Sequence, residues 1–323
     1  MKPQQPPEDP QSPPNGPETP TDRFFAAAST GLTQWWRWVL GASAVIGIFL
    51  GVVLVVSQAC KSSALAFICD NEVYGVSVLL EFGLRYLHHA GALIGVWLVA
   101  MLLQKKTLTQ VTTGRTSFDY SRVLFAAFAL LCVASVVLLL YRLMPGVEIT
   151  FQAQSLREYL PLVLAVLIFV SIQSGAEEVF FRGYILQGLS LLTRNRLVLA
   201  LGTAFLFTVP HFVTNTDLEA IQVVILTLVL MPPGILLAVM TLLDGGIELA
   251  VGYHAMQNIF NKLVLNLEVG RASSSSLFVA DADQAAALTI YFVHIFGLAL
   301  ALLVLNLRYK WFAYPWSKSG HKS

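Results

Sequence analysis

Charged side chains are scarce in this sequence: Asp, Glu, Lys and Arg make up only 12% of its 323 residues. A soluble domain carries about 25%, so the scarcity excludes an ordinary soluble protein. The chain has no basic patch and no basic stretch interleaved with aromatic residues, so no nucleic acid partner is expected. Cysteine is also rare, and Cys60, Cys69 and Cys132 do not have the spacing of a zinc site.

The sequence is dominated by long runs of apolar residues. Hydrophobic residues make up 56% of the chain and the mean hydropathy is +0.69. The runs are about 20 residues long, as membrane-spanning helices require, and do not alternate like barrel strands. The sequence predicts an all-α fold, a polytopic membrane helical bundle of about eight transmembrane helices. Seven lie at residues 38–59, 86–103, 123–141, 159–192, 197–211, 220–243 and 285–307, and another, before the last, contains His254 and Asn258.

The chain divides into four predicted parts. Residues 1–33 are expected to be a disordered, Pro-rich cytoplasmic tail, because they cannot bury enough apolar surface to order. Residues 34–145 hold the first three membrane helices, 146–310 hold the membrane domain with the candidate site, and 311–323 form a basic cytoplasmic tail. No cleavable signal peptide is expected, since the first apolar run starts too late and is too long.

Lys and Arg follow the second and fourth helices and the last one, whereas the opposite links carry mostly acids. The positive-inside rule therefore predicts that both termini are cytoplasmic. Cys60 and Cys69 then share an outer loop, where a disulfide could form.

Two adjacent carboxylates and an arginine interrupt the fourth apolar run. A charged side chain in hydrocarbon costs about 2.5–3.5 kcal/mol on insertion scales, so such residues suggest function. Glu178 and Arg182 are four residues apart and can pair on one helical face. Glu177 points about 100° away and has no obvious local partner, which leaves it free for chemistry. The alternative is a purely structural ion pair inside the bundle.

Two histidines are each followed by an asparagine four residues later. His211 and Asn215 are four residues apart, as are His254 and Asn258, so each pair shares a helical face. The adjacent His88 and His89 point about 100° apart, which favours structural or interfacial roles.

Together these residues resemble the CPBP family of intramembrane proteases, the CAAX-processing and bacteriocin-processing group. The family motifs are Glu-Glu-x-x-x-Arg, Phe-x-x-x-His and His-x-x-x-Asn, and the resemblance covers roughly residues 155–265. The matching residues are Glu177, Glu178 and Arg182; Phe207 and His211, with Asn215 one turn later; and His254 and Asn258.

The resemblance implies a glutamate-dependent endopeptidase without a required metal, and the residue chemistry agrees. Glu177 and His211 would hold and deprotonate a water. His254 and Asn258 would donate hydrogen bonds to the developing oxyanion. Zinc remains the alternative cofactor, because two histidines and a glutamate are a known ligand set.

The supporting residues have different expected tasks. Glu178 and Arg182 would fix the helix, and Asn215 would orient His211 or the water.

The expected partners are the lipid bilayer and a membrane-associated peptide or protein substrate. The sequence does not decide whether the substrate is a prenylated C-terminus, a bacteriocin leader or another membrane-anchored peptide. The expected location is a bacterial inner (cell) membrane. Two other functions compete with proteolysis. One is a proton-coupled transporter with a Glu and His relay, and the other is a non-catalytic immunity or chaperone-like membrane protein.

Overall fold

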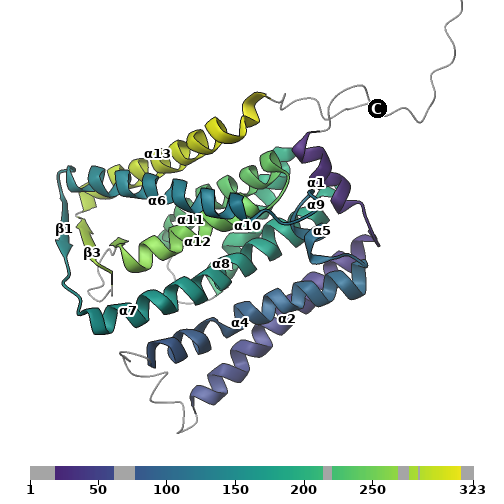
Figure 1. The fold of residues 1–323 in the computed structure, drawn as a ribbon, viewed down its shortest axis with the longest axis horizontal. Helices are drawn as coiled ribbons and strands as arrows, with labels where there is room; N and C mark the ends of the chain where they lie inside the picture. The colour runs from purple at the N-terminus through teal and green to yellow at the C-terminus, as the bar shows by residue number, and fades with distance from the viewer. Residues whose placement is uncertain (1–18, 62–76, 214–219, 268–275, 283, 314–323) are drawn as a thin grey trace, which may run out of the picture.

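The computed structural model describes residues 19–61, 77–213, 220–267, 276–282 and 284–313. These residues form a bundle of long helices, with α2 and α4 along one side and α6 and α13 along the other (Figure 1). The principal helices are α2 (Trp35–Cys60), α4 (Ser77–Val99), α6 (Tyr120–Arg142), α10 (Arg196–Val213), α11 (Ala220–Asp244), α12 (Glu248–Leu263) and α13 (Gln284–Tyr309). The predicted membrane helical bundle is confirmed.

One further helix is interrupted and runs over Leu156–Ser190. Its α-helical parts alternate with two π-helical segments, a form that often marks functional sites. In chain order the parts are α7 (Leu156–Ala165), η2 (Val166–Val170), α8 (Ser171–Glu178), η3 (Val179–Ile185) and α9 (Leu186–Ser190). The segment η3 begins directly after the two glutamates.

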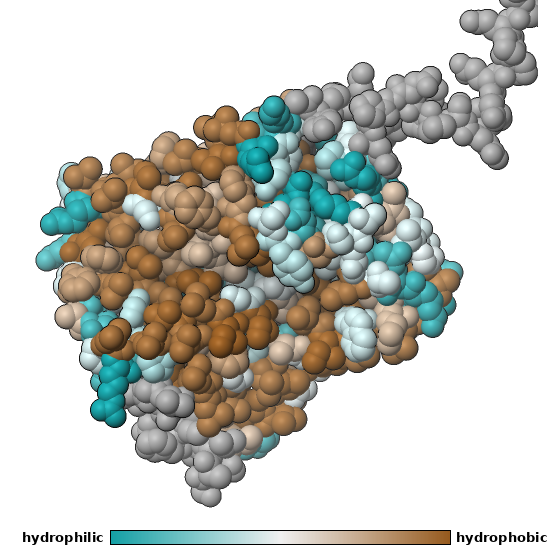
Figure 2. All heavy atoms as spheres, viewed as in Figure 1, coloured by the Kyte–Doolittle hydropathy of each residue, from teal (hydrophilic) through white to brown (hydrophobic). Residues whose placement is uncertain are grey.

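The predicted count of eight transmembrane helices is not confirmed. In the described part of the chain, six helices are long and apolar enough to cross a membrane. The other two predicted helices exist but are shorter, with 18 residues in α10 and 16 in α12. An apolar belt covers the face seen in Figure 2, with hydrophilic side chains towards the two ends. The protein is therefore an integral membrane protein.

The predicted tail is too long, because residues 20–28 are helical. Helix α1 (Pro20–Ala28) begins with a capping box between Thr19 and Asp22. Its Phe24 and Phe25 are buried among side chains of α9, α10 and α11. Residues 1–18 lie outside the described part of the chain.

A short sheet, which the all-α prediction did not include, lies at the opposite end from α1 (Figure 1). It contains β1 (Val147–Phe151), β2 (Leu265–Leu267) and β3 (Phe278–Ala282) in the order β1-β3-β2. Strand β3 pairs antiparallel with β1 and parallel with β2. Strand pairing therefore connects the segment that follows α6 with the segment that follows α12.

The link between α11 and α12 is buried at the end of the bundle near α1. Gly245 adopts a left-handed φ of 76° and its carbonyl accepts a hydrogen bond from the Gly114 backbone. Arg115 bridges Asp244 at 2.8 Å and Glu248 at 3.1 Å. Because Glu248 is fully buried, α12 begins inside the protein and not at its surface.

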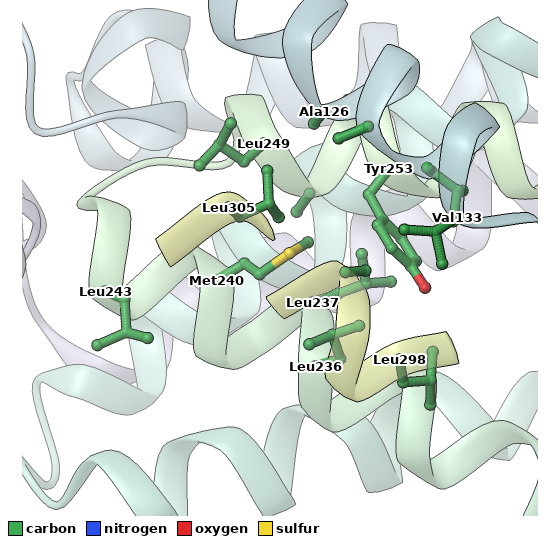
Figure 3. Packing of buried hydrophobic residues seen from close by; sticks show 14 of the residues in the cluster. Ala126, Val133, Leu236, Leu237, Met240, Leu243, Leu249, Tyr253, Leu298 and Leu305 are labelled. Carbon is green, nitrogen blue, oxygen red and sulfur yellow. The ribbon is translucent and has the colours of Figure 1, made fainter. Parts of the chain in front are cut away.

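The largest apolar core joins α6, α11, α12 and α13. Figure 3 shows side chains of this cluster, among them Ala126, Met240, Leu249, Tyr253 and Leu305. This packing holds α12 against its neighbours, and α12 carries one of the predicted motifs.

Candidate active site

The buried ion pair predicted by spacing is present. Arg182 Nη1 lies 2.9 Å from Glu178 Oε1, and both side chains are 0% exposed. The same guanidinium donates to the Gly234 carbonyl at 3.2 Å and stacks over the Phe207 ring at 4.4 Å. Arg182 therefore ties the glutamate helix to α10 and α11.

Glu178 has a second partner that helical spacing does not predict. His254 Nδ1, from α12, lies 2.7 Å from Glu178 Oε1. When one ring nitrogen of a neutral histidine donates a hydrogen bond to a carboxylate, that nitrogen carries the proton and the other is an acceptor. His254 Nε2 faces Glu177 Oε2 at 3.7 Å. The His254 ring is therefore held between the two adjacent glutamates.

Glu177 is not without partners, which corrects the expectation from the sequence. His89 Nε2, from α4, lies 3.2 Å from Glu177 Oε1, and Gln173 donates to the same oxygen at 3.2 Å. The side chain of Glu177 keeps 16% of its surface exposed, in contrast to the fully buried Glu178. Of the two glutamates, Glu177 is therefore accessible and Glu178 is fully buried.

His211 reaches the site from α10. Its ring packs against Phe207 with ring centroids 5.4 Å apart, and Phe207 also contacts the His254 ring at 5.8 Å. Phe207 therefore contacts the rings of both histidines. Asn215, its predicted companion, lies outside the described residues.

Asn258 lies one turn after His254 and donates to Ser174 Oγ at 3.1 Å. Ser174 is on α8, the helix of the two glutamates. The bond uses one of the two N–H groups of the amide, so the second N–H is available to another acceptor.

Several buried polar atoms of this cluster have no hydrogen-bond partner within the described ranges, and they include Glu178 Oε2, Arg182 Nε and His89 Nδ1. Such atoms are uncommon in folded proteins and call for an explanation such as a binding or catalytic role. No group of three or more His, Cys, Asp or Glu side chains among the described residues could hold a metal ion. Independence of metal stays a prediction.

Residues 158–260 match the family described as type II CAAX prenyl endopeptidase Rce1-like. This segment is an Rce1-like domain. It contains both glutamates, Arg182, His211, His254 and Asn258, and it lies within the region 155–265 where the resemblance was found. The predicted resemblance to this family is confirmed for residues 158–260.

A relative is the uncharacterized protein YyaK of Bacillus subtilis (strain 168), which is 30% identical over 185 residues. The match covers 56% of this chain and 60% of YyaK, so the chain spans less than two thirds of this curated relative. No solved structure matches.

Sequence reasoning missed three residues around the Rce1-like site. Gln173 is four residues before Glu177 and Ser174 is four before Glu178, so helical spacing could have found both as neighbours. His89 comes from outside the Rce1-like domain. Only the packing of α4 against α8 brings it to Glu177.

Proposed function

We propose that this protein is an intramembrane endopeptidase that hydrolyses a peptide bond of a membrane-associated protein or peptide. The observation that carries the proposal is the pair of adjacent glutamates, one accessible and one sealed, with His254 held between them. Such a pair separates the group that reacts from the group that maintains the geometry.

In the first step Glu177 is the general base. It accepts a proton from a water that His211 helps to hold, and the resulting hydroxide attacks the scissile carbonyl. Its partial exposure supports this role, because water must reach the carboxylate. His89 and Gln173 hold one carboxylate oxygen, which leaves Oε2 as the oxygen that faces the reaction. A positioned base contributes about 10²–10⁴-fold in rate.

The oxyanion formed by the attack is stabilised by His254 Nε2–H and the second N–H of Asn258. A ring whose Nδ1–H donates to Glu178 donates through Nε2 only when it carries both protons, so His254 acts here as the imidazolium. Glu178 and Arg182 hold the ring in place, and Ser174 holds the amide. Removing one such donor typically costs about 10²–10³-fold in rate.

In the last step the tetrahedral intermediate collapses and the peptide C–N bond breaks. Glu177 returns the proton it took from water to the leaving nitrogen, so the products are a carboxyl terminus and an amino terminus. No metal enters these steps, and the reaction needs no cofactor.

An endopeptidase creates new peptide termini, and this property gives the test. Peptide termini are compared between membranes that contain the wild-type protein and membranes that contain equal amounts of the Glu177→Gln variant. Termini that depend on Glu177 are expected, and they would also name the substrate. Identical sets of termini would refute the proposal, and proton-coupled uptake by proteoliposomes would then favour a transporter.

A further inference from the structure

A cavity lies beside the proposed active site, between α6, α11, α12 and α13. Its volume is about 570 Å³, within the range of roughly 300–1,000 Å³ that is typical of small-molecule sites. Its walls are mostly aliphatic and aromatic, and none of the lining residues in the described part of the chain is charged. A ligand that fits this cavity is therefore apolar over most of its length and carries no net charge.

The cavity extends along α6. Its lining residues on that helix extend from Leu130 to Tyr141, a length of about 17 Å at 1.5 Å per residue. The end at Leu130 belongs to the main apolar core, where Val133, Leu298 and Tyr253 lie near one another (Figure 3). The lining residue Val229 is 46% exposed on α11, so the cavity meets the apolar surface of the protein.

The other end of the cavity holds two polar atoms without a partner. Tyr141 Oη and His294 Nε2 are both buried and make no hydrogen bond to any residue that the structure describes. Tyr141 is only 1% exposed, and both residues line the cavity. Burying a hydroxyl without a hydrogen bond is unfavourable, so each atom gains a hydrogen bond from a bound polar group once its side chain turns towards the cavity.

Helix packing places these two residues at the same level. Gly297 on α13 lies so close to Val137 on α6 that an added Cβ would be 3.1 Å from it. The two helices are antiparallel, as the contact between Phe125 and Tyr309 at their other ends confirms. One turn from this contact, towards the sheet, α6 reaches Tyr141 and α13 reaches His294.

We propose that this cavity binds a neutral single-chain amphiphile of the membrane, such as a monoacylglycerol. Its hydroxyl groups donate to or accept from Tyr141 Oη and His294 Nε2, and its ester oxygens only accept. Its acyl chain extends along α6 towards Leu130. The site is distinct from Glu177 and does not depend on peptidase activity. The cavity wall includes Asn258, so the amphiphile lies next to the proposed oxyanion donor.

The test is a titration of the full-length protein in detergent with monoolein, followed by native mass spectrometry. A one-to-one complex is expected for the wild type and for Glu177→Gln. A lysophosphatidic acid of the same chain length should bind more weakly, because no Lys or Arg among the described lining residues can neutralise its phosphate.

Two matched variants on α6 test the position of the chain. Ala134 lines the cavity, and Ala134→Phe should fill it and weaken monoolein binding by about tenfold or more, as the loss of a fitted apolar pocket implies. Val136 lies on the outer face of α6 and is 44% exposed, so Val136→Phe should bind as the wild type does. Equal affinities for the two variants would overturn the proposal.

A double variant tests the polar end with little change in side-chain volume. The double variant Tyr141→Phe, His294→Leu removes both polar atoms and should weaken monoolein binding by about five- to tenfold, as the loss of hydrogen bonds predicts. It should leave the binding of a hydrocarbon of the same length unchanged. An unchanged affinity for monoolein would refute the assignment of the polar end.

Discussion

Substituting each glutamate by glutamine separates their roles, because glutamine keeps the volume and removes the charge. Glu178 and Arg182 are both fully buried and 2.9 Å apart. Removing one partner of a buried pair leaves an uncompensated charge and costs about 3–5 kcal/mol. Glu178→Gln also removes the charged acceptor of His254 Nδ1. We therefore expect this variant to lose both stability and activity.

Glu177→Gln should behave differently. The glutamine still accepts from Gln173 through its carbonyl oxygen, and the Glu178–Arg182 pair stays intact. Folding stability should remain within about 1 kcal/mol of the wild type, as for most substitutions that leave no buried charge unpaired. Turnover should fall by about 10²–10⁴-fold, because the general base is lost.

Thermal unfolding in detergent measures the stability of both variants, and cleavage of a substrate found by the comparison of termini measures turnover. The double variant Glu178→Gln, Arg182→Met is a control, because an apolar replacement of the cation removes the unpaired charge. It should be more stable than Glu178→Gln alone and still inactive. If Glu177→Gln unfolds the protein while Glu178→Gln is stable and inactive, the two roles have been assigned the wrong way round.

Four further predictions concern His89, α1, metal dependence and the orientation in the membrane. Replacing His89 by Ala should lower turnover by about ten- to a hundredfold, because a hydrogen bond to a charged group contributes about 1.5–3 kcal/mol, and His89→Gln should restore part of it; wild-type turnover in both variants would show that His89 does not position Glu177. Replacing Phe24 by Ala should lower the free energy of unfolding by about 3–5 kcal/mol, measured by thermal unfolding, whereas unchanged stability would mean that α1 does not anchor the bundle. Purified protein should keep its activity after exhaustive chelation, and activity that returns only with stoichiometric zinc would establish the metal alternative. Cysteines introduced into the two tails should react with labels added from the cytoplasmic side, and labelling of either tail only from outside would refute the predicted orientation. The Cys60–Cys69 disulfide stays a separate prediction, because Cys69 lies outside the described residues.

The sequence by itself determined the features that depend on neighbours along one helix. Apolar runs of about 20 residues identify membrane helices because a helix satisfies its own backbone hydrogen bonds in hydrocarbon. The spacing of Glu178 and Arg182 predicted their ion pair because residues four apart share a helical face. The three motifs identified the Rce1-like domain for the same reason, since each is a short pattern within one helix.

Only the tertiary structure decided which helix faces meet. His89 comes to Glu177 from α4, 88 positions earlier in the chain, and no pattern within either helix connects them. His254 reaches Glu178 because α12 packs against α8. The helical character of α1 was hidden by its Pro-rich surroundings, although its phenylalanines are buried against three other helices. The spacing of residues along one helix specifies which side chains share a face of that helix. The packing of apolar faces over the whole chain determines which side chains of other helices they contact.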